Sequence, residues 1–505
     1  MTPDLLHAAA DSNQWWAITP ELLLGGGALF LLVAEIVLPR PQHSIIPKLA
    51  VLVQAAALLG VLMNFHTSWI GESTFAGLLR HSLPGQIARV FFLTASLLTS
   101  FLASICLPRT RMPRVEFYHI LMVVTAAMML LAQSDHFAML FVALETVTIG
   151  FYILVSYFRD NALTLEAGLK YLVMGALSSA ILLFGIVLLY GAVGRVDGPN
   201  GAVHTGFEFR AVADFLRSHP DNFLAITGML LVLSGVAFKI GAFPFQIWIP
   251  DVYQGAPTPV TAFLAVASKA AGFAVLLTLV NNVFAPLYGL LIPALSMLAG
   301  ATIIFGNLSA LTQRNAKRLM GLSGVSHAGF LLMGVVASLQ VGWAAGAVWF
   351  YLFTYMLASM AVFGVMAHLA GADDTAQELE DYDLLAREQP LLAGVLVVGI
   401  GSLAGIPPLA GFMGKLLVFL AAFQAHLYGL LALAVAGVVV SIYYYFGWIK
   451  AAFFETGRSA TDSVATAASR PSPTIFGAAV LSALATATIL LGFFQEPLTR
   501  WLALK

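Results

Sequence analysis

The chain has 505 residues, of which 60% are hydrophobic and only 10% are charged, whereas soluble domains are roughly one quarter charged. This composition excludes a soluble globular enzyme and predicts a polytopic membrane protein. The net charge of −1 offers no basic surface for nucleic acid, and the single cysteine, Cys106, excludes an internal disulfide, a thiolate zinc site and an iron–sulfur cluster.

Apolar runs long enough to cross a bilayer core of about 30 Å predict an all-α fold with fourteen spans. No Lys or Arg precedes Arg40, so the first run lacks the basic segment of a signal peptide and is expected to remain as a span. The predicted spans are 19–38, 46–64, 88–107, 117–134, 136–157, 164–193, 222–243, 260–283, 287–309, 317–338, 342–369, 390–424, 428–452 and 474–495.

Two of these regions carry helix-breaking residues. The run 390–424 is too long for one straight helix and contains Gly405-Ile406-Pro407-Pro408 in its middle. A second break is expected between Lys239 and Lys269, because proline removes backbone donors and irregular backbone at membrane depth is tolerated only against protein or water. The residues of this second break are Gly241, Pro244, Pro250, Gly255, Pro257 and Pro259. A broken helix beside an ionisable group indicates an ion pathway.

The two breaks fall in blocks of equal size. Five predicted spans contain the break at Pro244, and the next five contain the break at Pro407-Pro408. Because five is odd, the second block enters the membrane from the opposite side, as in transporters with inverted repeats. We therefore expect an N-terminal three-helix segment (1–116), a first five-helix repeat (117–283), a second inverted five-helix repeat (287–452) and a C-terminal helix (453–505).

Basic residues are distributed unequally between the two sets of loops. With fourteen spans both termini share a side, and the positive-inside rule places the more basic set of loops in the cytoplasm. Both termini are therefore expected on the non-cytoplasmic side, and the acidic stretch Asp373–Glu388 is expected in a cytoplasmic linker. Twelve basic residues (Arg40, Lys48, Arg109, Arg111, Arg114, Arg159, Arg314, Lys317, Arg318, Arg387, Arg458 and Arg470) oppose seven on the terminal side (Arg80, Arg89, Arg195, Arg210, Arg217, Arg500 and Lys505).

Five formal charges and one histidine lie well inside the predicted spans. At about 3 kcal/mol each, the five charges would cost about 15 kcal/mol if they faced lipid. We therefore expect them to face the protein interior or water. They are Glu145, Lys170, Lys239, Lys269 and Lys415, and the histidine is His327.

Simpler interpretations exist for several of these residues. Glu145 and Lys239 would form a static structural ion pair. Lys170 lies nearer its helix end and would extend to the surface. His327 would be a hydrogen-bonded buried histidine, although its ordinary pKa of about 6.5 suits proton relay. A lysine buried without a partner gives up its proton more readily, which suits proton storage near neutral pH.

The sequence contains no glycine-rich dinucleotide-binding motif after a strand, no P-loop and no pair of mid-membrane histidines spaced for haem. We therefore expect the chain to bind no cofactor and no metal. It would move ions without carrying electrons itself.

Several stretches between about residues 117 and 450 together resemble one known family. They include LFVALETVTIGFYILVSY, EAGLKYLVMGALSSA, FKIGAFPFQIWIPDVYQGAPTPVTAFLAVASKAAGF, NAKRLMGLSGVSHAGFLLMG and SLAGIPPLAGFMGKLLVF. These stretches resemble the antiporter-like subunits of proton-translocating NADH:quinone oxidoreductase, respiratory complex I. Lys415 in GIPPLAGFMGK is similar to subunit N, whereas subunit M has a glutamate there and subunit L is longer. The family often has a proline shortly after the span-five glutamate, where this chain has Gly150.

The resemblance implies roles for the buried charges. Glu145 and Lys239 would be the coupling pair, Lys269 the central relay and Lys415 the far proton site, with Lys170 and His327 along the hydrated axis. NADH, FMN, iron–sulfur clusters and quinone would be bound by partner subunits. Expected partners are the antiporter-like subunit M and small helical subunits, in the cell inner membrane. The alternatives are a subunit of a multisubunit cation/proton antiporter or of a membrane hydrogenase complex, which neighbouring genes would distinguish.

Overall fold

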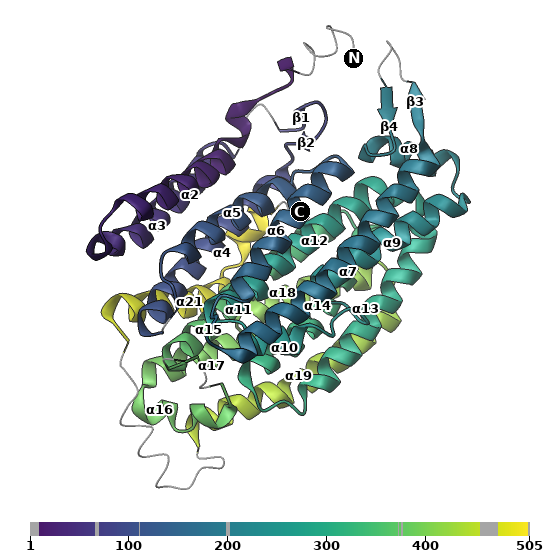
Figure 1. Cartoon of the computed structure of the whole chain (residues 1–505). Coiled ribbons are helices and arrows are strands. Elements are labelled where there is room, and N and C mark those ends of the chain that lie inside the picture. The colour runs from purple at the N-terminus through teal and green to yellow at the C-terminus, as the bar shows by residue number, and fades with distance from the viewer. Residues whose placement is uncertain are drawn as a thin grey trace.

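The computed structural model describes residues 10–65, 70–110, 112–197, 203–371, 373–374, 377–454 and 473–502. In these ranges the chain is a bundle of long helices (Figure 1), with two short antiparallel hairpins outside it. Of the residues used to predict orientation, Arg111, Arg458, Arg470 and Lys505 lie outside the described ranges.

The N-terminal segment forms three long helices at one edge of the bundle (Figure 1). A small β-hairpin and single turns of 3₁₀-helix connect them. The elements are η1 (Trp15–Ile18), α2 (Thr19–Val37), η2 (Arg40–Ile45), α3 (Ile46–Met63), β1 (Ser73–Thr74), β2 (Leu79–Arg80), α4 (Leu83–Cys106) and η3 (Leu107–Arg109).

The next block contains the first interrupted helix, which is split into α9 and α10. Its last long helix is continuous but contains two π-helical segments, one of which ends directly before Lys269. The elements are α5 (Glu116–Leu131), α6 (Phe137–Val155), α7 (Ala162–Val193), β3 (Arg195–Asp197), β4 (Val203–Thr205), α8 (Phe209–Ser218), α9 (Phe223–Ile240), α10 (Ile249–Gly255), α11 (Thr258–Phe263), η5 (Leu264–Ser268), α12 (Lys269–Thr278) and η6 (Leu279–Val283).

The remaining elements contain the second interrupted helix, which is split into α17 and α18. They are η7 (Ala285–Leu287), α13 (Tyr288–Ala310), α14 (Ala316–Ser338), α15 (Ala344–Leu369), η8 (Leu379–Tyr382), α16 (Leu385–Glu388), α17 (Pro390–Ala404), α18 (Ala410–Gln424), α19 (Tyr428–Phe453), α21 (Ile475–Phe493) and α22 (Glu496–Trp501).

The all-α membrane fold predicted from the sequence is confirmed. Among the described residues, twelve helices are long and apolar enough to cross a membrane, and α5, α17 and α18 are shorter apolar helices. Counting α5 as one span and the pair α17 and α18 as another gives the predicted fourteen.

Both interrupted helices end their first half in the same way. Gly241 caps the end of α9 and Gly405 caps the end of α17, and each glycine has a left-handed backbone, with φ of +73° and +85°. Glycine adopts this conformation without the penalty that a Cβ would bring. A proline follows three residues later in each case, at Pro244 and Pro408, so the helix cannot resume at once.

Three segments at the centre of the bundle are almost fully enclosed. In their most apolar stretches, 94% of the residues are buried in α11 to η6, 100% in α14 and 94% in α15. Outer helices such as α3 and α21 bury only 28% and 22%, so their apolar side chains face outward, as lipid-facing helices do. Lys269 and His327 lie on the central helices and are therefore remote from lipid.

Glycine allows α6 to pack closely on its neighbour. A Cβ at Gly150 would lie 2.1 Å from Cγ2 of Val124 in α5, far inside van der Waals contact. α6 is helical from Phe137 to Val155, so Gly150 does not break the helix at the position where the family often has proline. Gly150 instead lets α5 approach α6 closely.

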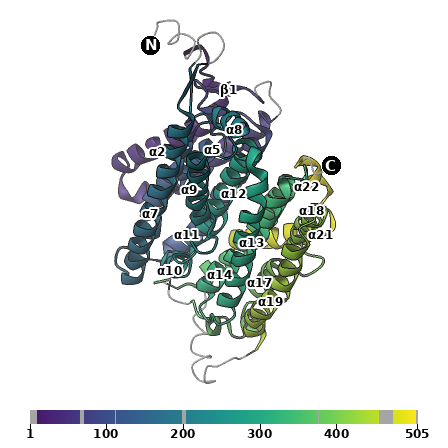
Figure 2. The same ribbon diagram turned by 90° about the vertical axis from the view of Figure 1, so that its right-hand side faces the viewer.

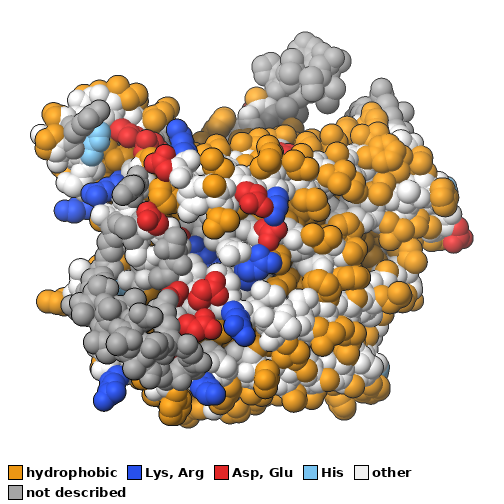
Figure 3. Space-filling model, turned by 60° about the horizontal axis from the view of Figure 1, so that its bottom comes forward, with side chains coloured by type: hydrophobic (Ala, Val, Ile, Leu, Met, Phe, Trp, Pro, Cys, Tyr) orange, Lys and Arg blue, Asp and Glu red, His pale blue; other side chains and the backbone are white. Residues whose placement is uncertain are grey.

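The two ends of the bundle differ in the elements they carry. The hairpins and α8 lie at one end, with α22 toward the same end, and α10 and α16 lie at the other (Figures 1 and 2). On the α16 end, charged side chains gather in the middle of the face and apolar side chains surround them (Figure 3). Charges therefore concentrate where the bundle meets water.

A buried ion pair joins α2 to α4. The Arg89 guanidinium binds the Glu21 carboxylate through two nitrogens, and both side chains are 3% exposed. Arg89 also donates to the carbonyl of Ala17 at 2.7 Å, and the Gln133 amide donates to Glu21 at 3.0 Å. These extra hydrogen bonds offset the cost of removing both charges from water.

Because removing one partner of such a pair leaves a buried unpaired charge, Glu21→Ala should destabilise the protein by about 3 to 5 kcal/mol. The thermal midpoint of the purified complex in detergent measures this loss. The double variant Glu21→Met with Arg89→Met should recover most of it, and Glu496→Ala, which breaks an exposed ion pair with Arg500, should change the midpoint little. A Glu21→Ala midpoint equal to that of Glu496→Ala would contradict the interpretation.

Candidate functional site

Lys239 lies in the last turn of α9 and is buried, with 7% of its surface exposed. Its ammonium donates a hydrogen bond to the hydroxyl of Thr148 on α6. Glu145 lies on the same helix, one turn before Thr148, and its carboxylate accepts a hydrogen bond from Ser179 on α7. No nitrogen–oxygen pair of Lys239 and Glu145 lies within the 4.0 Å limit of an ion pair, so the two side chains form no direct ion pair.

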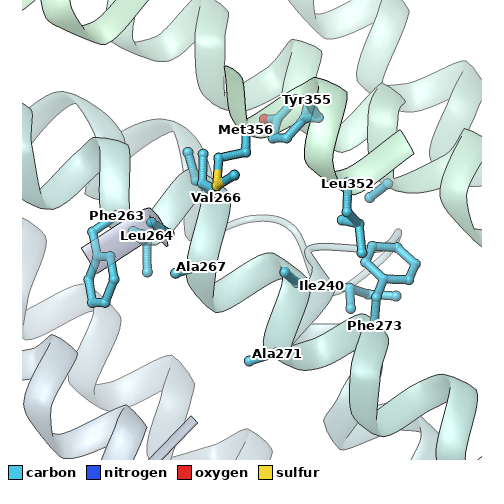
Figure 4. Packing of buried hydrophobic residues seen from close by; sticks show 14 of the residues in the cluster. Ile240, Phe263, Leu264, Val266, Ala267, Ala271, Phe273, Leu352, Tyr355 and Met356 are labelled. Atoms are coloured by element: carbon cyan, nitrogen blue, oxygen red, sulfur yellow. The ribbon is translucent and has the colours of Figure 1, made fainter. Parts of the chain in front are cut away.

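Lys269 begins α12, directly after the π-helical segment η5. Its ammonium donates to the carbonyl of Gly324 at 2.7 Å and to the hydroxyl of Tyr355 at 3.3 Å. π-Helical segments inside helices are frequent at functional sites. Apolar side chains, including Val266 and Met356, pack around Tyr355 (Figure 4).

Glycine brings α9 and α12 close together between Lys239 and Lys269. Gly272 lies three residues after Lys269 and therefore on the same face of α12. A Cβ at Gly272 would lie 2.6 Å from Cγ2 of Ile240 and 3.5 Å from Cβ of Lys239. The two buried lysines therefore lie on directly packed helices.

His327 lies on α14, less than one turn after Gly324, and is 2% exposed. Its Nδ1 is 2.7 Å from the hydroxyl of Tyr351, and its Nε2 is 3.1 Å from the hydroxyl of Tyr445. The ring centroids of His327 and Tyr355 are 5.0 Å apart. Both ring nitrogens therefore have hydroxyl partners, and Tyr355 connects the surroundings of His327 to those of Lys269.

Lys415 belongs to α18, but its ammonium lies at the end of α17. It donates to the carbonyls of Leu403 at 2.8 Å and Ala404 at 3.0 Å, which are among the last carbonyls of that helix and lack intrahelical partners. A Cβ at Gly405 would lie only 3.2 Å from Nζ of Lys415. The glycine that breaks the helix therefore also leaves room for the ammonium group.

Lys170 does not lie in the buried layer. Its side chain is 44% exposed and forms ion pairs of 2.7 Å with Glu166 and with Asp251 of α10. Asp251 also binds Arg318 of α14 at 2.8 Å. Lys170 therefore follows the simpler interpretation, in which its position near one end of α7 lets it extend to the charged end of the bundle.

A second buried ion pair closes the same end of the bundle next to α11. Lys317 and Asp374 are 2.7 Å apart, with side chains 1% and 5% exposed. Lys317 also donates to the carbonyl of Ala256 at 2.9 Å, and Asp374 accepts from the backbone and hydroxyl of Thr258 at the start of α11. Asp374, at the start of the acidic stretch, is therefore a structural residue within a stretch that was expected to be a solvated or partner-facing linker.

Sequence analysis missed the polar residues that lie between the buried charges. Thr148 follows Glu145 by three residues, and Tyr351 and Tyr355 are four apart, so each pair shares a helix face. Such spacing relative to a predicted buried charge was the available signal. Tyr445 had no comparable signal, because only folding brings α19 beside His327.

No group of three or more His, Cys, Asp or Glu side chains among the described residues could hold a metal ion. The candidate site consists of buried lysines, a histidine and hydroxyl groups, and Lys239 and Lys415 lie beside the two helix breaks. Ionisable groups beside broken helices are typical of the class of ion-translocating membrane subunits.

Comparisons with known proteins agree with this class. The family described as NADH:quinone oxidoreductase/Mrp antiporter, transmembrane, matches residues 134–441. NADH-quinone oxidoreductase subunit N 1 of Opitutus terrae is 60% identical over 99% of both chains, and subunit N of Desulfitobacterium hafniense is 35% identical over 96% of both.

Solved structures also resemble this chain over nearly its whole length. A chain of respiratory complex I from Thermus thermophilus with bound aureothin superposes with a TM-score of 0.76 at 32% identity, covering 94% of this chain and 97% of that one. A chain of the Mrp complex from Dietzia has a TM-score of 0.78 over 96% of each chain, but its 18% identity shows a shared fold alone. The chain belongs to the subunit N family of NADH:quinone oxidoreductase, the antiporter-like membrane subunits of complex I.

The hydrogen bond between Lys239 and Thr148 gives a specific prediction. Thr148→Val keeps the side-chain shape but removes the hydroxyl, which leaves a buried ammonium without its acceptor. Proton pumping by the assembled complex should fall clearly. Thr146→Val on the same helix is the control, because Thr146 is partly exposed and bonds only its own helix, at the carbonyl of Val142. Equal pumping by the two variants would exclude a role for Thr148.

Proposed function

We propose that this chain carries protons across the membrane through Glu145, Lys239, Lys269, His327 and Lys415, coupled to quinone reduction elsewhere in the complex. The observation that carries the proposal is that Lys239, Lys269 and Lys415 are each at least 93% buried yet bind only hydroxyl or carbonyl groups. A lysine without a carboxylate partner can release its proton, whereas a tight ion pair would hold it.

The chemistry of electron transfer belongs to partner subunits in this proposal. NADH, FMN, iron–sulfur clusters and quinone would be bound there, and this chain would contribute translocation to the enzyme. The side chains found at its core support this division, because ammonium, imidazole and hydroxyl groups exchange protons and do not accept electrons.

Glu145 would act as the coupling switch. It acts on Lys239 through space, and weakening this interaction would let Lys239 pass its proton toward Lys269. A tenfold change in proton affinity is worth about 1.4 kcal/mol, and moving one charge across 100 mV costs about 2.3 kcal/mol. A change of about a hundredfold, or about 2.7 kcal/mol, is therefore sufficient.

The neighbour on the α6 face would be antiporter-like subunit M, with small helical subunits elsewhere. Glu145 is only partly buried, and Val142, Ile149 and Ile153 on α6 are 60%, 54% and 47% exposed. A carboxylate facing lipid is costly, so a protein surface that covers this face would lower the free energy.

For the membrane arrangement we propose two inverted repeats, 117–283 and 287–452, between the three-helix segment 1–116 and the C-terminal helix 453–505. The matching glycine–proline breaks support this division. The location would be the cell inner membrane with both termini on the non-cytoplasmic side, as the excess of Lys and Arg in the opposite loops supports.

Lys269→Ala should lower proton pumping and coupled quinone reduction about tenfold or more, as expected for loss of a proton-transfer group. Lys269→Arg should keep the charge but not the activity, because arginine stays protonated. Pumping and quinone reduction in vesicles, with assembly checked by native electrophoresis, measure both. Lys450→Ala, an exposed lysine at the end of α19, is the control. Full pumping by the arginine variant would leave Lys269 only an electrostatic role.

Glu145→Gln should leave the complex assembled but lower coupled activity well below that of Glu145→Asp, which keeps the charge on a shorter arm. The same vesicle assay compares them. Glu166→Gln is the matched control, since Glu166 is exposed and pairs with Lys170 at the surface. If Glu145→Gln pumps like the unmodified complex, the charge is dispensable and the switch is refuted.

A further inference from the structure

One backbone N–H in the first break, residues 241–248 between α9 and α10, has its acceptor on a helix that is distant in the sequence. The N–H of Phe243 donates to the hydroxyl of Thr302 on α13 at 3.0 Å. The N–H groups of Ala242 and Phe245 instead bond to carbonyls of α9 and of the break itself, at 2.9 and 2.7 Å. Thr302 is 0% exposed, so a buried side chain of α13 supplies part of the hydrogen bonding of the break.

The Thr302 hydroxyl is oriented to accept this hydrogen bond. It donates its single hydrogen to the carbonyl of Leu298, one turn earlier on α13, and its lone pairs remain for the N–H of Phe243. At membrane depth, bulk water is absent and cannot replace a lost acceptor. Without the hydroxyl, the break would keep an unpaired donor or would move to find another partner.

A second contact attaches the same residue of the break to α13. The ring centroids of Phe243 and Phe305 are 5.5 Å apart, and Phe305 follows Thr302 by three residues, on the same face of α13. Lys239 precedes Phe243 by four residues. The hydrogen bond and the ring contact therefore fix the chain directly beyond the buried lysine.

Another face of α13 packs tightly on α14 beside His327. A Cβ at Gly306 would lie 2.4 Å from the backbone nitrogen of Ser326, so no side chain fits between the two helices there. Asn307 donates to the hydroxyl of Ser326 at 2.8 Å, and His327 is the next residue. α13 therefore connects the first break to the helix that carries the buried histidine.

The second break, between α17 and α18, is stabilised differently. There the N–H of Gly411 donates to the hydroxyl of Ser402 at 2.9 Å, and both residues belong to the two halves of the same interrupted helix. The hydroxyl acceptor of the second break is therefore internal, whereas that of the first break comes from α13. This difference makes the second break an internal control for changes at Thr302.

We propose that Thr302 is a positioning residue for proton transfer at Lys239. It fixes the first break against α13, and the packing of α13 on α14 keeps the break in place relative to His327. Thr302 itself neither gains nor loses a proton, because its hydroxyl hydrogen is bonded to the carbonyl of Leu298. This inference rests on the proposed role of Lys239 as a proton carrier.

Hydroxyl-free variants of Thr302 in the assembled complex test the inference. Thr302→Val keeps the side-chain shape, Thr302→Ala is a second hydroxyl-free variant, and Thr302→Ser keeps the hydroxyl. Thr99→Val is the matched control, because Thr99 is also 0% exposed and its hydroxyl donates within α4, to the carbonyl of Ala95 at 2.8 Å. Backbone hydrogen exchange over 241–248 and 405–411 reports on the two breaks, and proton pumping in sealed vesicles is measured per assembled complex.

We expect Thr302→Val and Thr302→Ala to exchange about fivefold faster or more over 241–248, as loss of the acceptor of a buried N–H implies. Exchange over 405–411 should not change. Proton pumping per assembled complex should also fall about fivefold or more in both variants. Thr302→Ser and Thr99→Val should resemble the unmodified complex in both measurements.

Unchanged exchange over 241–248 in the hydroxyl-free variants, or a Thr302→Ser variant as impaired as Thr302→Val, would overturn the role of the hydroxyl. A defect confined to assembly, with normal pumping per assembled complex, would show a structural role only and would overturn the proposal. Faster exchange with normal pumping would do the same. None of these results would refute the proposed function, which fails instead if Lys239→Ala pumps normally.

Discussion

The ammonium group of Lys415 lies at the carbonyl end of an interrupted helix, and the arrangement of the membrane core around that break depends on this interaction. A helix that stops inside a membrane leaves its last carbonyl groups without partners and carries a partial negative charge at that end. Lys415 binds two such carbonyls at the end of α17, and Lys239 lies in the last turn of α9. Lys415 lowers the cost of the break in α17, and the break in turn lowers the cost of burying Lys415.

Because the carbonyl end of a helix stabilises a buried ammonium group, such a lysine does not need a carboxylate partner. Lys269 has no helix end beside it and instead binds the Gly324 carbonyl and the Tyr355 hydroxyl. Neutral partners of this kind satisfy an ammonium group without fixing its proton. The carboxylates bound to lysine at the α16 end, Asp251 and Asp374, form ion pairs outside the lysine layer, at the surface and around the start of α11.

The sequence was sufficient for the helices, for both breaks and for the set of deeply buried lysines, because length, apolar runs and proline positions are local signals. It was insufficient to predict the hydrogen-bond and ion-pair partners of these lysines. Lys415 was expected to lie beside its break, but its binding to the end of α17 depends on how α18 folds back. Lys170 extends to water, as its nearness to the helix end suggested, but its partner Asp251 follows from the packing of α7 against α10 and was not predictable. Thr148, the hydroxyl partner of Lys239 one turn after Glu145, could have been found from helical spacing alone.

The central claim is that Lys269, His327 and Lys415 belong to one proton route, and a double-variant cycle of Lys269→Ala and Lys415→Ala tests it most directly. Proton pumping per electron would be measured for each single variant and for the pair in the assembled complex. Residues that act in series are not additive, so the account predicts that the double variant pumps no less than the weaker single variant. Losses that multiply, with the double variant well below both singles, would contradict a single route and indicate two independent ones.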